Sequence, residues 1–210
     1  MEEKSKISFL ESIFIFTIGS LLGFVIESVF YIIKYGEYVN KQGLIFGPFK
    51  PIYGLGCLLI TIIYYMLKRK TNLNIFIWGI VSGTIFEYIA SLFIEKVFNS
   101  YIWSYKDFNM NLNGRIYLPY CIAWGIISLI WIRLLYPPLK RLFDNFMKSK
   151  PFKIAFILLS IFIIFDIFFT GLVLFRQGYR NKNNFIFKII DKVYNEEDIV
   201  KKFPKFRPLK

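Results

Sequence analysis

The stretch GSLLGFVIESVFYIIKYGEYVNKQGLIFGPFKPIYG, from Gly19 to Gly54, carries a pattern that returns later in the chain. It begins with two glycines and a glutamate spaced by four residues: Gly19, Gly23 and Glu27. The same residue types recur 60 positions later as Gly79, Gly83 and Glu87. Because residues four apart share one helix face, each copy predicts a helix that presents two glycines and a carboxylate in line.

The second half of the pattern is a polar loop followed by a proline and an apolar run. In the first copy its marker residues are Asn40, Gly43, Pro48, Tyr53 and Gly54. In the second copy, 71 positions later, they are Asn111, Gly114, Pro119, Trp124 and Gly125. The offset grows from 60 to 71 through an insertion of 11 residues in the second loop. We therefore expect a duplicated two-helix unit whose copies share one orientation, since two spans separate equivalent positions.

Composition places the chain in a membrane. Hydrophobic residues make up 56% of its 210 residues, aromatic residues make up 20%, and the mean hydropathy is +0.49. Several apolar runs approach the ~20 residues that cross a bilayer. The sequence thus predicts an all-α, multi-pass protein of the cell membrane with about five transmembrane helices, four of them in the parallel duplicated unit with re-entrant Gly/Pro loops. The expected spans are 9–33, 52–67, 73–94, 116–136 and 152–175.

Three regions are expected along the chain. They are a duplicated four-helix domain over 1–138 with repeats at about 9–70 and 73–138, a basic loop and fifth transmembrane helix over 139–175, and a basic polar tail over 176–210. Two adjacent prolines, Pro137 and Pro138, are expected to end the fourth helix. In the tail, 185–193 is expected to form an interfacial amphipathic helix. Residues 201–210 are expected to lack fixed structure.

The net charge of +13 comes from lysines and arginines that lie mainly between the apolar runs and in the tail. This placement favours contact with anionic lipid headgroups over binding to nucleic acid, so the lipid bilayer is the expected partner. It does not decide which side of the membrane the N-terminus faces. The sequence contains no histidine, which excludes His-ligated metals and His-based catalysis, and no cofactor or metal is expected. Cys57 and Cys121 fall in apolar runs and are expected to be packing residues.

Carboxylates inside the spans are the candidate binding groups. An ionised carboxylate at the centre of a spanning helix costs roughly 2.5 to 3.5 kcal/mol, so Glu27 and Glu87 are candidates for a functional site. The alternative is that each carboxylate only holds the fold together by pairing with a nearby cation or with loop N–H groups. Arg115, at the entrance of the fourth helix, is the expected cation partner of the carboxylates and a further candidate substrate-binding residue. Asp166 is expected to be a hydrogen-bonding residue inside the bundle.

The loops contribute the remaining candidates. Six residues are expected to serve tight or re-entrant turns: Gly43, Gly47, Pro48, Pro51, Gly54 and Gly114. Four others are candidate substrate-binding residues: Asn40, Asn113, Tyr53 and Trp103. The alternatives for the two asparagines and for Trp103 are turn formation and interfacial anchoring.

The segment GLIFGPFKPIYG, from Gly43 to Gly54, carries a family resemblance. Together with Glu87-Tyr88, Trp103, Tyr105 and the segment from Asn113 to Ile116, it resembles the bacterial membrane family described as "Putative ABC-transporter type IV". The resemblance covers about residues 9–136. It implies a transport role without naming a substrate.

These observations favour a permease-like component of a transporter for a small polar or anionic solute. The chain lacks the Gly-x4-Gly-Lys-Ser/Thr phosphate loop, so a separate ATPase subunit is an expected partner, and a homo-oligomer is a further candidate. Two alternatives stay open. One is a membrane-embedded enzyme acting on lipid headgroups, with Glu27 and Glu87 as acid and base and Arg115 holding a phosphate. The other is a non-catalytic membrane scaffold or accessory subunit.

Overall fold

The structure is a computed structural model that describes residues 7–40, 43–180 and 185–209. Four of its helical segments are long and apolar enough to cross a membrane. They are α1 (Phe9–Tyr35), α3 (Asn72–Phe98), the continuous helix Leu118–Lys148, and α6 (Lys150–Gly178). The all-helical membrane architecture expected from the sequence is thereby confirmed. The remaining expected span, α2 (Pro51–Met66), has 16 residues. At 1.5 Å per residue it reaches only about 24 Å of a hydrocarbon core that is about 30 Å thick.

Local signals in the sequence set the helix ends. Ser8 caps α1 by accepting a hydrogen bond from the Glu11 N–H, and Gly36 ends the helix in the left-handed conformation, with φ of 72°. Thr71 caps α3 in the same way as Ser8 caps α1. Pro51 occupies the first position of α2, where its missing N–H leaves no hydrogen bond unmade.

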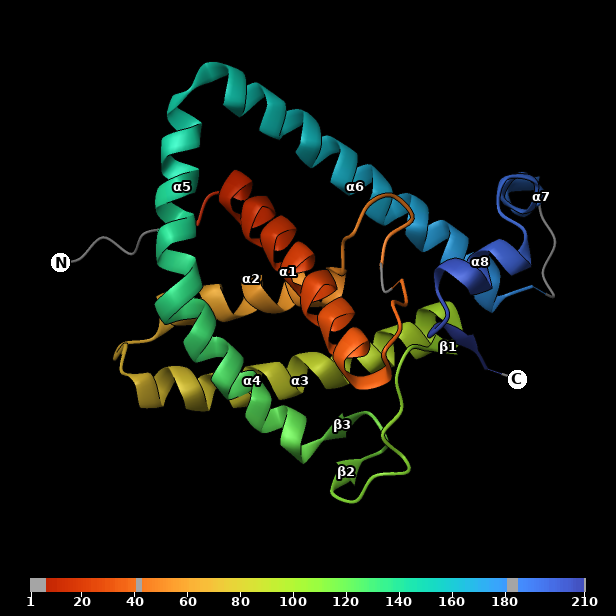
Figure 1. Ribbon diagram of the computed structural model, residues 1–210, viewed down its shortest axis with the longest axis horizontal. Helices are drawn as coiled ribbons and strands as arrows, with labels where there is room; N and C mark the ends of the chain where they lie inside the picture. Colours follow the sequence, from red (N-terminus) through yellow and green to blue (C-terminus); the bar gives the residue numbers. More distant parts are fainter. Residues whose placement is uncertain (1–6, 41–42, 181–184, 210) are drawn as a thin grey trace.

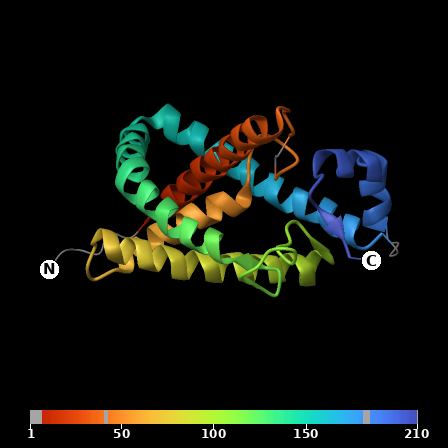
Figure 2. The ribbon, with the colours of Figure 1, turned by 60° about the horizontal axis from the view of Figure 1, so that its bottom comes forward.

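The four helices of the expected repeat form two hairpins. Helix α1 packs mainly on α2, and α3 packs mainly on α4 (Leu118–Ile130). In Figure 1, α1 and α3 both run from left to right, whereas α2 and α4 run back from right to left. The tilted view in Figure 2 shows the same directions. The C-terminal ends of α1 and α3 therefore lie toward the same side of the molecule.

The helix that begins with α4 does not end at Pro137 and Pro138. It passes through a π-helical segment, η1 (Trp131–Leu135), and continues as α5 (Tyr136–Lys148). Within η1 the Tyr136 N–H donates to the Trp131 carbonyl, five residues back. Prolines cannot donate to the preceding turn, and a π-helical register upstream lets the helix continue past them. The expectation that these prolines end the helix is therefore wrong.

The C-terminal region is folded onto the right-hand end of the molecule (Figure 1). It contains α7 (Phe185–Val193), at the position expected for a tail helix, α8 (Glu196–Lys202), and β4 (Arg207–Pro208). Strand β4 pairs antiparallel with β1 (Ser100–Tyr101). The other two strands, β2 (Asn111–Leu112) and β3 (Ile116–Tyr117), form a hairpin in the loop before α4.

The expectation that residues 201–210 lack fixed structure is wrong for the described residues up to Leu209. Phe203 and Phe206 are buried in a cluster whose other buried members are Ile45, Val173, Phe187, Ile190 and Ile199. Burial of these large apolar side chains offsets the entropy lost when the basic tail becomes ordered. The same cluster joins the tail to the loop before α2, through Ile45.

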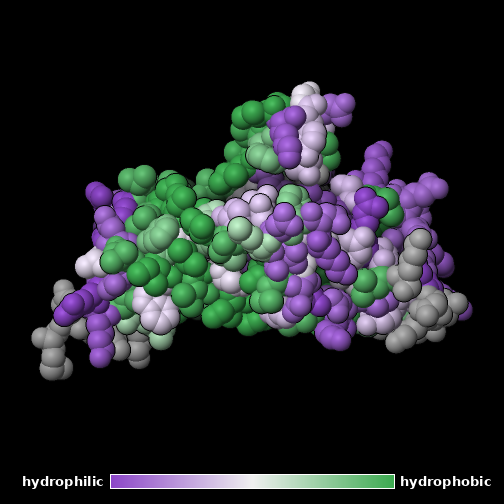
Figure 3. Space-filling view, turned by 90° about the horizontal axis from the view of Figure 1, so that it is seen from below, coloured by the Kyte–Doolittle hydropathy of each residue, from purple (hydrophilic) through white to green (hydrophobic). Residues whose placement is uncertain are grey.

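Surface hydropathy follows this arrangement. In Figure 3 hydrophobic side chains cover much of the left and middle of the visible face, and hydrophilic side chains gather toward the right. The hydrophilic part corresponds to the end where α7, α8 and β1 lie in Figure 1. The polar loops thus lie at the end of the molecule where α1 and α3 have their C-termini.

Candidate functional site

The first carboxylate, Glu27, is held between α1, the start of α2 and the C-terminal tail. Its Oε1 accepts a hydrogen bond of 3.0 Å from the Tyr53 hydroxyl. Its Oε2 lies 2.5 Å from the Lys50 Nζ and 3.5 Å from the Lys205 Nζ. Glu27 is therefore an ion-paired carboxylate with one neutral donor and two ammonium groups around it.

Gly23 permits the approach of Tyr53 to Glu27. A Cβ atom at Gly23 would lie 2.3 Å from the Tyr53 Cγ, far inside van der Waals contact. The aromatic ring can therefore lie against the backbone of α1 one helical turn before the carboxylate. The glycine spacing seen in the sequence is what allows the hydroxyl to reach Glu27.

The second carboxylate, Glu87, is arranged in the same way. Its Oε2 accepts from the Trp124 Nε1 at 3.1 Å, and its Oε1 accepts from the Tyr105 hydroxyl at 2.8 Å. A Cβ atom at Gly83 would lie 2.3 Å from the Trp124 Cγ. Trp124 therefore rests on Gly83 and donates to Glu87, as Tyr53 rests on Gly23 and donates to Glu27.

The other glycine contacts of the two hairpins also correspond. A Cβ at Gly19 would meet Cys57, and one at Gly79 would meet Ser128, which is 71 positions after Cys57. A Cβ at Gly54 would meet the side chains of Phe16 and Ser20, and one at Gly125 would meet Phe76 and Ile80, each 60 positions later. The sequence offsets of 60 and 71 therefore connect residues that make equivalent contacts.

The two sites differ in charge. Lys50 contacts Glu27, but the residue 71 positions after Lys50 is Cys121, which has no charge to offer Glu87. Within the described part of the chain, Glu87 forms no ion pair. Its two hydrogen-bond donors are both neutral and both aromatic.

The two sites adjoin each other. The charges of Glu27 and Glu87 both act on the Tyr53 hydroxyl, and Tyr120 interacts electrostatically with both Tyr53 and Tyr105. In the loop, burial together with the Glu87 carboxylate raises the pKa of the Tyr105 hydroxyl above its ordinary value, so this hydroxyl stays protonated and donates. The two carboxylates and their aromatic donors thus lie toward the loop end of the bundle.

Arg115 does not pair with Glu27 or Glu87 as expected. Its guanidinium pairs with Glu95 and donates to the Ser91 Oγ at 3.0 Å. Ser91 and Glu95 lie four and eight residues beyond Glu87 on α3, closer to the loop that carries Arg115. The guanidinium therefore meets them first, and the expected pairing of Arg115 with Glu27 or Glu87 is wrong.

Two candidate residues of the second loop, Trp103 and Asn113, form hydrogen bonds within the loop and to α3. The Trp103 Nε1 donates to the Arg115 carbonyl at 3.0 Å, and the Asn113 Nδ2 donates to the Tyr88 hydroxyl at 3.0 Å. Asn113 and Gly114 both have positive φ, 55° and 68°, as the turn between β2 and β3 requires. The structure therefore places Trp103, Asn113 and Gly114 in the framework of the loop.

The Gly/Pro loop before α2 lies partly inside the bundle. Its Phe46 N–H lies 3.2 Å from Oδ1 and 3.3 Å from Oδ2 of Asp166, and the Ile45 N–H donates to the Thr170 Oγ1 at 2.9 Å. Asp166 is fully buried in α6. A buried backbone N–H outside regular structure needs such an acceptor, so Asp166 is the internal hydrogen-bonding residue that the sequence predicts.

Backbone geometry explains the glycines and prolines of this loop. The Gly43 N–H donates to the Phe49 carbonyl at 2.7 Å and closes the loop, while Gly47 adopts a φ of 84° immediately before Pro48. The Lys50 N–H donates to the Ser20 carbonyl at 3.1 Å, which attaches the start of α2 to α1. Asn40 is exposed in the segment after α1.

Sequence reasoning missed three charged residues that take part in these contacts, Lys50, Lys205 and Glu95, and one buried carboxylate elsewhere, Glu11. Glu11 is buried near the opposite end of the bundle, where it accepts a 2.8 Å hydrogen bond from the Tyr136 hydroxyl. The signal for Glu11 was a carboxylate in the first turn of an apolar helix. No local signal joins Lys205 to Glu27, because 178 residues separate them.

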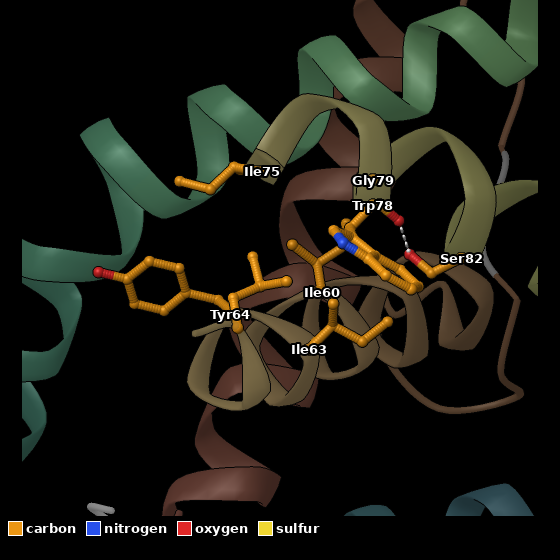
Figure 4. Close-up of a pocket in the computed structure, with 8 residues that line it drawn as sticks. Ile60, Ile63, Tyr64, Ile75, Trp78, Gly79 and Ser82 are labelled. Atoms are coloured by element: carbon orange, nitrogen blue, oxygen red, sulfur yellow. Dashed lines mark hydrogen bonds between the residues drawn. The ribbon is translucent and has the colours of Figure 1, made fainter. Parts of the chain in front are cut away.

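Two hollows among the described residues have neither Glu27 nor Glu87 in their lining. One lies between α2 and α3 and is lined by Ile60, Ile63, Tyr64, Ile75, Trp78, Gly79 and Ser82, together with Leu67 (Figure 4). Its volume of about 10 Å³ has room for about one water molecule. A larger pocket of about 200 Å³, between α1, α5 and α6, has only apolar residues in its lining. Over the described residues, no cluster of three or more Cys, Asp or Glu side chains could hold a metal ion.

Comparison with known proteins supports the membrane-transport context of this site. No curated protein and no solved structure matches the chain significantly. One family model, described as "Putative ABC-transporter type IV", matches residues 14–171 of the 210-residue chain. The match extends from α1 into α6 and contains Glu27, Glu87, their aromatic donors and the Gly/Pro loop, but not Lys205. The chain therefore belongs to the family described as "Putative ABC-transporter type IV".

Proposed function

We propose that this protein is a permease-like membrane component of a transporter and that a small polar solute binds at the adjoining Glu27 and Glu87 sites. The observation that carries the proposal is a pair of carboxylates within apolar helices, each held by aromatic donors at the same end of the bundle. Maintaining such groups in an apolar environment is costly, and polar groups inside a membrane domain commonly mark a solute pathway. Membership of an ABC-transporter-type family agrees with this function.

We further propose that the two hairpins are copies of one duplicated unit. Matched contacts at Gly19 and Gly79, Gly23 and Gly83, and Gly54 and Gly125 support this origin. The proposal includes α2 as a fifth span, shortened because the loop before it enters the bundle. Backbone outside helices is tolerated at membrane depth only where protein covers it, and Asp166 and Thr170 supply such cover.

The contacts favour a neutral or cationic solute over an anionic one. Three cations that contact carboxylates at the loop end are already paired: Lys50 and Lys205 with Glu27, and Arg115 with Glu95. An anion would have to displace a carboxylate from one of these cations. A solute with N–H groups or positive charge would instead add to the carboxylates already present.

The functional test is reconstitution of the full chain, purified in mild detergent together with whatever chains co-purify. We expect an ATPase chain among them, and no ATP hydrolysis by this chain alone, because its sequence contains no phosphate loop. In liposomes with ATP, we expect uptake from a panel of radiolabelled small polar solutes. Uptake should fall at least tenfold in Glu27→Gln and Glu87→Gln and stay unchanged in Glu37→Gln, an exposed control.

Other outcomes would identify the alternatives. Turnover of a bilayer lipid by the purified chain, lost in Glu87→Gln, would replace the permease by a headgroup enzyme. A stable partner chain without solute uptake or lipid turnover would favour the scaffold. Either result would overturn the transport proposal.

A further inference from the structure

We propose that the Glu87 site binds a small organic ammonium ion, held by the carboxylate and by the faces of the surrounding aromatic rings. The inference rests on the proposed function, since it names the solute class of that site. It comes from comparing the two halves of the molecule, which present the same carboxylate arrangement with different charges around it.

The first half already contains an ammonium site. The Lys50 Nζ lies 2.5 Å from Glu27 Oε2 and 5.8 Å from the centroid of the Tyr53 ring. The Lys205 Nζ lies 3.5 Å from the same oxygen and 5.2 Å from the centroid of the Tyr31 ring. Here a carboxylate and aromatic faces together bind primary ammonium groups of the protein itself.

The second half has the same framework without the lysine. Trp124 takes the place of Tyr53 on the glycine surface, and the residue 71 positions after Lys50 is the uncharged Cys121. Both oxygens of Glu87 accept a hydrogen bond from a neutral donor. A carboxylate has about four acceptor positions, so Glu87 retains the capacity to accept from an ammonium group as Glu27 does.

Aromatic rings cluster beside Glu87. The Tyr105 ring centroid lies 5.4 Å from that of Tyr120 and 6.0 Å from that of Tyr117. Phe108 joins the cluster, 5.2 Å from Tyr117. The negative faces of such rings attract a cation, most strongly where water is excluded. Tyr120 is 50% exposed and therefore offers a ring to an incoming ligand.

Other ligand classes fit this site less well. A divalent metal ion requires several anionic or neutral acceptor ligands, whereas the side chains that contact Glu87 are the donors Tyr105 and Trp124. An anion would be repelled by Glu87 and by the ring faces. A neutral alcohol would form the hydrogen bond but would gain nothing from the aromatic cluster. An alkylammonium or tetraalkylammonium ion satisfies both the carboxylate and the rings.

The test is equilibrium binding by isothermal titration calorimetry, with the full chain in an uncharged maltoside detergent that contains no choline headgroups. The probes are propylammonium and tetramethylammonium, with 1-butanol as a neutral control and propionate as an anionic control. We expect both cations to bind with one high-affinity site per chain, and neither control to compete. Glu87→Gln should weaken cation binding at least tenfold, while Glu37→Gln should leave it unchanged.

A second variant covers the case in which Glu87→Gln does not fold. Tyr120→Leu changes an exposed ring and should weaken tetramethylammonium binding by threefold or more while the protein remains folded. Equal binding of propionate, or undiminished cation binding in both Glu87→Gln and Tyr120→Leu, would refute the ammonium site. Cation binding without solute uptake would refute only the transport proposal, and uptake without cation binding would refute only the ammonium class.

Discussion

Replacing Gly83 by alanine should separate Trp124 from α3 and weaken the Glu87 site. A Cβ at this position would lie 2.3 Å from Trp124 Cγ, 2.5 Å from Cδ2 and 2.6 Å from Cβ. Ordinary carbon contacts are about 3.5 to 4.0 Å apart, so the indole must move by about 1.2 Å or more. Because the indole is rigid near its Cβ, the movement must involve the α3 and α4 backbones.

The expected cost follows from two effects. Overpacking of a close helix contact costs about 1 to 3 kcal/mol. A displacement of that size along the bond direction would also stretch the 3.1 Å hydrogen bond from Trp124 Nε1 to Glu87 beyond bonding range. Loss of a hydrogen bond to a charged group costs about 1.5 to 3 kcal/mol of stability. The higher helix propensity of alanine stabilises the helix by about 1 kcal/mol. We therefore expect a net destabilisation of about 1.5 to 5 kcal/mol.

The assay is reversible unfolding in mixed maltoside and dodecyl sulfate micelles, followed by tryptophan fluorescence. Gly171→Ala in α6 is the matched control, because no atom lies within 4 Å of its added Cβ, and helix propensity should raise its free energy of unfolding by about 1 kcal/mol. In a Trp124→Ala background, the cost of Gly83→Ala should shrink because the Cγ and Cδ2 atoms nearest to the added Cβ are absent. Equal stability of the Gly83→Ala and Gly171→Ala proteins would refute the close-contact argument.

Three further outcomes are expected. Asp166→Leu should leave the Phe46 N–H without its acceptor and raise its hydrogen-exchange rate at least tenfold, whereas Asp166→Asn should have a smaller effect. Hydrogen bonds from Arg176 lower the pKa of the Asp191 carboxyl, so its contribution to stability is present above about pH 4 and is lost as the pH falls through the lowered folded pKa. Melting curves between pH 2 and 7 should show this loss in wild type and not in Asp191→Asn. Arg115→Gln should increase proteolysis of the loop over 99–117 but leave ammonium binding within twofold, and a tenfold loss of binding would contradict the assigned role.

Local patterns alone determined the main helices and the two carboxylates. Hydropathy identified the apolar runs, and the four-residue spacing placed each glutamate on a glycine face, because helix periodicity is a property of neighbouring residues. The cost of a charge in a membrane was sufficient to select Glu27 and Glu87. The offsets of 60 and 71 connected Tyr53 with Trp124 before any contact was known.

The tertiary structure decided which groups pair and which segments become ordered. Arg115 pairs with Glu95 because Glu95 lies nearer its loop, and the helix continues past Pro137 and Pro138 because the π-helical turn accommodates them. Lys205 contacts Glu27 across 178 residues of sequence because the aromatic side chains of the tail are buried against Ile45. Ion pairing and burial depend on which distant segments meet in space, and sequence spacing carries no measure of that distance.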